Sequence, residues 1–94
     1  MQVKRLNKTF PLGRQVMTHN AKESIPVPDM NAALNRHATC DRGNICAERW
    51  NQNNEALECG DQLLSVYIAS NGIKFWIITE WDRSVTTVLL PEDY

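Results

Sequence analysis

Four side chains in this sequence could together cleave a phosphodiester. They are His37, Lys74, Arg83 and Thr86. Metal-independent ribonucleases that form a 2′,3′-cyclic phosphate need a general base and groups that stabilise the charge on the phosphate. His37 would be the base, while Lys74 and Arg83 would surround the phosphate. Thr86 would hold a phosphate oxygen, on the same sheet face as Lys74 if their strands pair.

The same residues also have structural interpretations, which we favour. His37 would close the apolar face of a helix, and Lys74 would be a solvated strand residue. Asp82 and Arg83 would fix a turn through an Asx contact and an ion pair. Catalysis has only fold analogy to support it, and Glu80 and Asp82 would repel RNA.

His37 and the three cysteines, Cys40, Cys46 and Cys59, contain ligand types that zinc prefers. His37-x-x-Cys40 has a chelating spacing. Cys46 and Cys59, however, would lie roughly 20 Å apart on one predicted helix, at about 1.5 Å per residue. One ion cannot bind both, so we expect no metal site. We interpret the cysteines as reduced thiols that pack as small hydrophobic residues.

A tryptophan in a short acidic turn is the best candidate for a binding surface. Trp81 stands between Glu80 and Asp82, and Arg83 follows. An exposed Trp beside an Arg has the composition of a binding hot spot. A half-buried Trp that anchors the turn would show the same pattern. We expect the binding surface to comprise Glu80, Trp81, Asp82, Arg83 and Thr86.

The last third of the chain predicts three strands. Apolar and β-branched residues alternate over 62–69, 73–79 and 85–90. Asn71-Gly72 would join the first two strands in a type I′ turn, with positive φ at both positions. The acidic turn would join the second strand to the third, and Trp76 would face the core or the helices. The expected fold is α+β, with a three- to four-stranded antiparallel meander and two helices packed on one face.

The first predicted helix spans 29–38, with Asp29 as its N-cap. The second spans about 45–59 and ends at Gly60, because glycine readily takes the left-handed conformation after a last helical turn.

The region before these helices predicts little regular structure. Residues 15–18 could form a short strand, whereas 19–28 lack periodicity and contain two prolines, which predicts a loop.

Length and composition predict one domain, because 94 residues of which 43% are apolar can form a single core. We divide the chain into a basic, irregular N-terminal arm, 1–13, and an α+β domain, 14–94. The chain has no apolar run of membrane-spanning length and no secretory leader. We therefore expect a cytoplasmic protein with no membrane association.

Charge is distributed unevenly along the chain. The first 22 residues contain five basic residues and no acidic one, so the remainder carries −6 of a net charge of −1. Such an arm can attract an anionic partner, nucleic acid included. No aromatic residue is interleaved with these charges as in single-strand binders. We favour a solvated tail.

The C-terminal sequence resembles a family of short uncharacterised proteins. The resemblance rests on residues 63–67 (LLSVY) and 72–94 (GIKFWIITEWDRSVTTVLLPEDY). The family pattern reads approximately RLLSxY…GxKxWIITEADRSxTTxLLPEEY, and it is carried by plasmids, prophages, integrative elements and integron gene cassettes. Upstream, Arg36-His37 and Asp41-x-Gly43 look like its RH…GDWG segment, and Asn53-x-x-Ala56-Leu57 looks like its NxxAL helix.

The resemblance covers roughly residues 10–94 and implies an origin on mobile DNA, without implying a chemistry. The family's Trp in GDWG is Arg42 here, and its usual Ala before DRS is Trp81. Cys40 and Cys59 are also unusual for the family. Some relatives carry a restriction–modification label, but this chain has no Gly-rich loop after a strand to bind S-adenosylmethionine. We expect no cofactor.

We therefore predict a non-catalytic binding protein with an unidentified protein partner. The genomic context suggests an anti-defence or regulatory role. The alternative is a small metal-independent ribonuclease or toxin-like protein. An unpaired edge of the meander could also join two copies in a homodimer.

Overall fold

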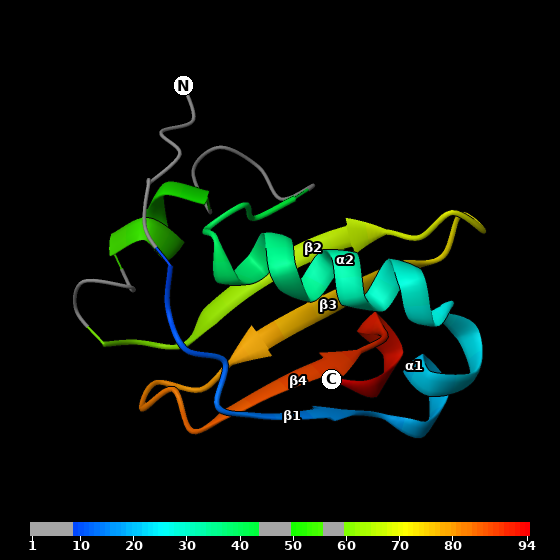
Figure 1. The fold of residues 1–94 in the computed structure, drawn as a ribbon, viewed down its shortest axis with the longest axis horizontal. Coiled ribbons are helices and arrows are strands. Elements are labelled where there is room, and N and C mark those ends of the chain that lie inside the picture. The colour runs from blue at the N-terminus through cyan, green and yellow to red at the C-terminus, as the bar shows by residue number, and fades with distance from the viewer. Residues whose placement is uncertain (1–8, 44–49, 56–59) are drawn as a thin grey trace.

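The structure is a computed structural model that describes residues 9–43, 50–55 and 60–94. It is an α+β fold in which helices pack on a four-stranded sheet (Figure 1). The elements, in chain order, are β1 (Arg14–Met17), α1 (His19–Ser24), α2 (Val27–Ala38), β2 (Leu63–Ile68), β3 (Lys74–Thr79), β4 (Val85–Leu89) and the 3₁₀ helix η1 (Pro91–Asp93). Residues 50–55 are also helical.

The sheet is mixed, with the strand order β1-β4-β3-β2. The predicted antiparallel pairing of β2 with β3 and of β3 with β4 is confirmed. The purely antiparallel meander is wrong, because β1 pairs with β4 in parallel, with Arg14 opposite Val85. A parallel neighbour needs a long crossover, and here the crossover contains both α1 and α2.

The turn between β2 and β3 differs from the predicted type I′ turn. The Gly72 N–H donates to the Ala69 carbonyl at 2.9 Å, and the Ala69 N–H donates to Ile73 at 2.9 Å. Gly72 has φ 84°, whereas Asn71 is not in the left-handed region. This is the three-residue loop in which a type I turn precedes a left-handed glycine. Asn71 instead uses its side chain, whose Nδ2 donates to the Ser24 carbonyl at 2.8 Å.

Helix α2 begins before the predicted N-cap. Its cap is Pro26, and Pro28 lies in the first turn, where a missing N–H costs nothing. Asp29 is therefore inside the helix. Its carboxylate accepts hydrogen bonds from the backbone and the hydroxyl of Ser70, at 3.0 and 2.6 Å, and so attaches α2 to the β2–β3 loop.

The predicted loop over 19–28 is also wrong, because residues 19–24 form α1. Thr18 caps this short helix by accepting from the Ala21 N–H at 3.2 Å. Ala21 is fully buried, and Thr18 and Asn20 both donate to Asp93. Contacts with distant parts of the chain thus stabilise a helix too short to be stable alone.

One face of the sheet is covered by α1 and α2 (Figure 1). Alternation along β3 places Phe75 and Ile77 on this face, and both are buried. The core consists mainly of aliphatic and aromatic side chains from these helices and from β2, β3 and β4. They are Ala21, Ile25, Met30, Ala33, Leu34, Tyr67, Ala69, Phe75, Ile77, Val88 and Leu90.

The second predicted helix, 45–59, lies largely outside the described residues. Its helical portion 50–55 lies beside the edge of β2, where Asn53 Oδ1 accepts from the Leu64 N–H at 2.6 Å. Gly60 has φ 77°, the left-handed conformation predicted for it.

The described part of the N-terminal arm, 9–13, has no regular secondary structure but packs on the domain. Phe10 is buried, and its N–H donates to the Ala38 carbonyl at 3.1 Å. The described part of the chain contains no helix long and apolar enough to cross a membrane.

Candidate functional site

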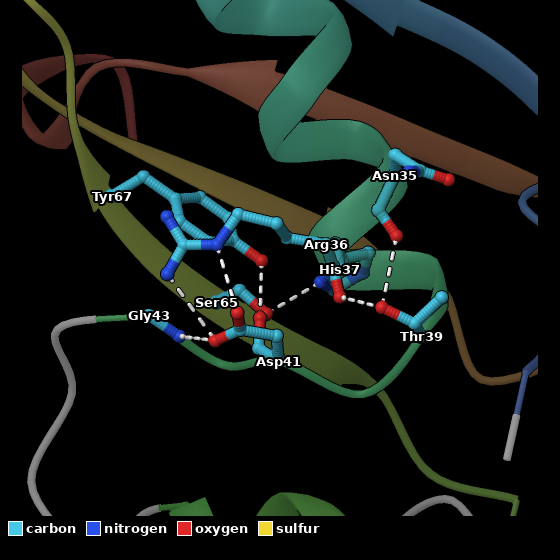
Figure 2. Close-up of polar contacts among 8 residues, drawn as sticks. All are labelled: Asn35, Arg36, His37, Thr39, Asp41, Gly43, Ser65 and Tyr67. Carbon is cyan, nitrogen blue, oxygen red and sulfur yellow. Dashed lines mark hydrogen bonds and ion pairs between the residues drawn. The ribbon is translucent and has the colours of Figure 1, made fainter. Parts of the chain in front are cut away.

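His37 lies at the centre of a buried chain of polar side chains between α2 and the sheet. Its Nδ1 is 2.5 Å from Ser65 Oγ, and its Nε2 is 2.9 Å from Thr79 Oγ1. The contact with Ser65 is visible in Figure 2. Thr79 Oγ1 is in turn 2.7 Å from Thr86 Oγ1, which donates to the Leu12 carbonyl at 2.6 Å. We call His37, Ser65, Thr79 and Thr86 the buried polar cluster.

The buried polar cluster has the properties of a satisfied core network. His37, Ser65, Thr79 and Thr86 all have no exposed surface. Burial, helped by the positive charges of Arg42 and Arg83, lowers the pKa of His37 to about 3. The imidazole is therefore neutral near pH 7, and both ring nitrogens have hydroxyl partners. A general base needs access to substrate, which this arrangement does not provide.

Lys74 lies far from this cluster. It pairs with Ile68 beside the β2–β3 loop, whereas Thr79 and Thr86 pair at the opposite end of the sheet. Alternation also places Lys74 on the face that α2 does not cover, so the prediction that it shares a face with Thr86 is wrong. The four residues of the ribonuclease hypothesis therefore form no common site.

The β3–β4 turn presents Trp81 to solvent. Trp81 is 66% exposed, whereas Thr86 is fully buried and cannot contact a partner. Arg83 adopts φ 62°, and its Nη1 donates to the carbonyls of Asp61, Glu80 and Trp81 at 2.5, 3.0 and 3.2 Å. The guanidinium thus cross-links the backbone of the turn.

A second set of contacts fixes the same turn. Asp82 Oδ1 accepts from the backbone and the hydroxyl of Ser84, at 3.1 and 2.6 Å, which is the predicted Asx contact. These hydrogen bonds lower the pKa of Asp82. Gly13 packs so closely on the turn that an added Cβ would lie 2.4 Å from the carbonyl oxygens of Arg83 and Ser84. The turn backbone is therefore held on both sides.

Arg36, Asp41 and Tyr67 form a polar cluster where α2 ends (Figure 2). Arg36 makes two hydrogen bonds to the Asp41 carboxylate, at 2.8 and 3.3 Å, and lies 4.8 Å from the Tyr67 ring centroid. Asp41 Oδ1 also accepts from the Gly43 N–H, and the Asp41 carbonyl accepts from the Tyr67 hydroxyl. The Arg36-His37 and Asp41-x-Gly43 motifs thus have structural roles.

Arg42 is a buried cation, and its burial was not predicted from the sequence. It has no exposed surface, and its carbon Cζ lies 5.8 Å from the Phe10 ring centroid. Nη2 donates to the Asn53 carbonyl at 3.5 Å, while Nε and Nη1 lack hydrogen-bond partners in the described part of the chain. Burial lowers the pKa of this guanidinium.

Among the proposed metal ligands, His37 and Cys40 are both buried. Cys46 and Cys59 lie outside the described residues. Within 9–43, 50–55 and 60–94, no three His, Cys, Asp or Glu side chains are grouped to hold a metal ion.

A groove of about 420 Å³ lies on the sheet face opposite α2. Leu64, Trp76 and Ile78 line it from the strands, and Tyr94 lines it from the residue after η1. Its other lining side chains are Gln52, Asn53 and Gln62. Sequence reasoning did not identify this site. The prediction that Trp76 faces the core or the helices is wrong, because alternation along β3 places it on the sheet face opposite Phe75 and Ile77.

The two edges of the sheet differ. At the β2 edge, the Val66 N–H donates to the Arg42 carbonyl at 3.1 Å, and Gly43 forms a parallel bridge with Val66. At the other edge, β1 has no strand beyond it among the described residues. Within the described ranges, β1 is therefore the sheet edge that has no neighbouring strand.

No protein-family model, curated protein or solved structure matches this chain.

Proposed function

We propose that this is a non-catalytic binding protein that contacts a protein partner through the β3–β4 turn. The observation that carries the proposal is an indole 66% exposed on a turn whose backbone is cross-linked by hydrogen bonds. The contact surface comprises Glu80, Trp81 and Asp82. Arg83 serves it by shaping the turn.

The energetic advantage of this turn is that it is already ordered. A loop that must become ordered loses conformational entropy on binding, whereas a fixed turn loses little. Truncation of a central interface tryptophan typically costs about 2 kcal/mol or more of binding free energy. Trp81 can therefore supply a large share of the affinity of a modest interface.

The acidic flanks indicate the chemistry of the partner. Glu80 and Asp82 flank the indole, so a partner with a basic rim around an apolar pocket would complement the turn. The resemblance to proteins of mobile elements suggests a host or element protein, in an anti-defence or regulatory setting.

The test compares affinity capture by the wild-type chain with capture by Trp81→Ala. Val27→Ala is the matched control, because Val27 is also 66% exposed and lies on α2. We expect Trp81→Ala to reduce recovery of the specific partner at least about tenfold, and Val27→Ala to retain it. Equal recovery by all three proteins would remove Trp81 from the interface.

A second experiment addresses catalysis. Purified protein incubated with labelled RNA in EDTA should leave the RNA intact, because His37 is buried and its ring nitrogens are engaged. RNA cleavage that disappears in a folded His37→Ala variant would contradict the proposal.

A further inference from the structure

The groove on the uncovered face of the sheet has the dimensions of a small-molecule site. Its volume of about 420 Å³ falls within the range of roughly 300–1,000 Å³ that such sites span. Trp76 forms part of its floor, and the Tyr94 ring approaches the Trp76 ring at 5.5 Å with an interplanar angle of 63°. The two rings meet edge to face, so together they form an aromatic corner that a flat ligand can contact.

Amide side chains provide the polar part of the groove. Asn53 is held in place, since its Oδ1 accepts from the Leu64 N–H at 2.6 Å. Gln52 and Gln62 are exposed. Gln62 Nε2 is 3.4 Å from Glu80 Oε1, which is long for a hydrogen bond and leaves the amide adaptable. Each amide offers one carbonyl acceptor and two N–H donors.

We infer that this groove binds the uncharged heteroaromatic base of a nucleoside, with adenine as the preferred base. The base stacks on Trp76, as bases stack on exposed aromatic side chains generally. The Gln62 amide then offers an acceptor and a donor side by side, the pattern with which Asn and Gln recognise the N6/N7 edge of adenine. Gln52 faces the remaining polar edge of the base.

The electrostatics of the groove favour the base over the phosphate. No side chain that lines the groove among the described residues carries a charge at neutral pH. A ligand recognised mainly through phosphate would need cations in the lining. A purely aliphatic ligand would make no use of the amides of Gln52 and Gln62. A sugar is the main competitor, because it also uses aromatic platforms and amides.

The test is a titration of the ¹⁵N-labelled full chain with adenosine. It follows the side-chain amide signals of Gln52 and Gln62 and the indole signal of Trp76. We expect saturable shifts with a Kd on the order of 100 µM, ordinary for a ligand of this size. Adenosine monophosphate should bind within about threefold of adenosine, and raising salt from about 50 to 200 mM should change neither affinity much.

Two variants locate the site. Trp76→Ala should weaken adenosine binding about tenfold, because it removes the stacking platform. Gln62→Leu should weaken it about fivefold, and Gln15→Leu, an exposed glutamine on β1, should leave it unchanged. Trp76→Ala alters the sheet, so the test rests on Gln62→Leu, whose side chain is at the surface.

Three results would overturn the inference. The first is the absence of saturable shifts at millimolar adenosine. The second is movement of the same signals by maltose or ribose and not by adenosine, which would identify a sugar site. The third is wild-type affinity in Gln62→Leu, which would place adenosine elsewhere on the chain.

Discussion

The buried polar cluster and the β3–β4 turn are two polar regions at the same end of the sheet with opposite environments. Thr79 and Thr86 flank the turn in sequence and lie inside the protein, where hydroxyls and His37 satisfy one another. Trp81, between them in sequence, is 66% exposed. The segment 79–86 therefore contains both structural and surface residues, and the two kinds are distinguished by their burial.

Among the variants that test this contrast, His37→Ala should have the largest effect on the free energy of unfolding. It would leave a cavity and deprive the Ser65 and Thr79 hydroxyls of the imidazole, at a cost of about 4 kcal/mol in the free energy of unfolding. Urea denaturation followed by circular dichroism measures this cost. His19→Ala is the control, since His19 is exposed, and we expect a change within about 0.5 kcal/mol. Equal effects would show that His37 is not buried in solution.

Gly13→Ala should have the next largest effect. Gly13 has φ 63°, and its added Cβ would overlap the backbone oxygens of the turn. We expect a loss of about 3 kcal/mol, as well as a displaced turn. Gly72→Ala is the matched control, because its φ is 84° but its Cβ would meet open space, so it should cost only about 1 kcal/mol. Similar losses for both variants would refute the close packing at Gly13.

The buried polar cluster should also make stability depend on pH. The folded-state pKa of His37 is about 3, below its ordinary value of 6.5. Between these two pKa values, His37 is therefore protonated in the unfolded chain and neutral in the folded chain. Stability is full above about pH 6.5 and falls towards pH 3, with a slope near 1.4 kcal/mol per pH unit.

The pH range of the measurement separates His37 from the carboxylates. Hydrogen bonds lower the pKa values of Asp29, Asp82 and Asp93. Protonation of these carboxylates therefore also reduces the stability of the fold, but only in more acidic solution. Urea midpoints between about pH 4.5 and 6.5 should thus report His37. A His37→Gln variant with the same slope would contradict this assignment.

The smallest expected effect on stability is that of Trp81→Ala. An exposed side chain away from the core should change the free energy of unfolding by no more than about 0.5 kcal/mol, measured by the same urea titration. Trp81→Ala should therefore affect binding and leave folding unchanged. A loss of several kcal/mol would mean that Trp81 anchors the turn instead of contacting a partner.

The fold was predictable where the sequence pattern is local. Alternating residues and turn signals located β2, β3 and β4, because each strand pairs with its neighbour in the chain. The parallel pairing of β1 with β4 was not predictable, because it depends on a crossover through two helices. Helix α1 was missed for a similar reason, since Asp93, far along the chain, stabilises its start.

The candidate sites were predictable to different extents. The turn around Trp81 was located because all its residues are consecutive. The groove was missed because its lining comes from four separate segments, and no local pattern relates Gln52 to Trp76 or Tyr94. The burial of Arg42 was not predictable from its neighbours in the sequence, because it follows from packing against Phe10.

The unequal edges of the sheet limit how copies of this chain can associate. Strand pairing between copies requires an edge with free backbone groups. Because the 42–43 segment and Asn53 occupy the β2 edge, strand pairing between two copies through the described residues would bring β1 against β1, around a twofold axis. Such an assembly stops at two chains and cannot extend into a fibre.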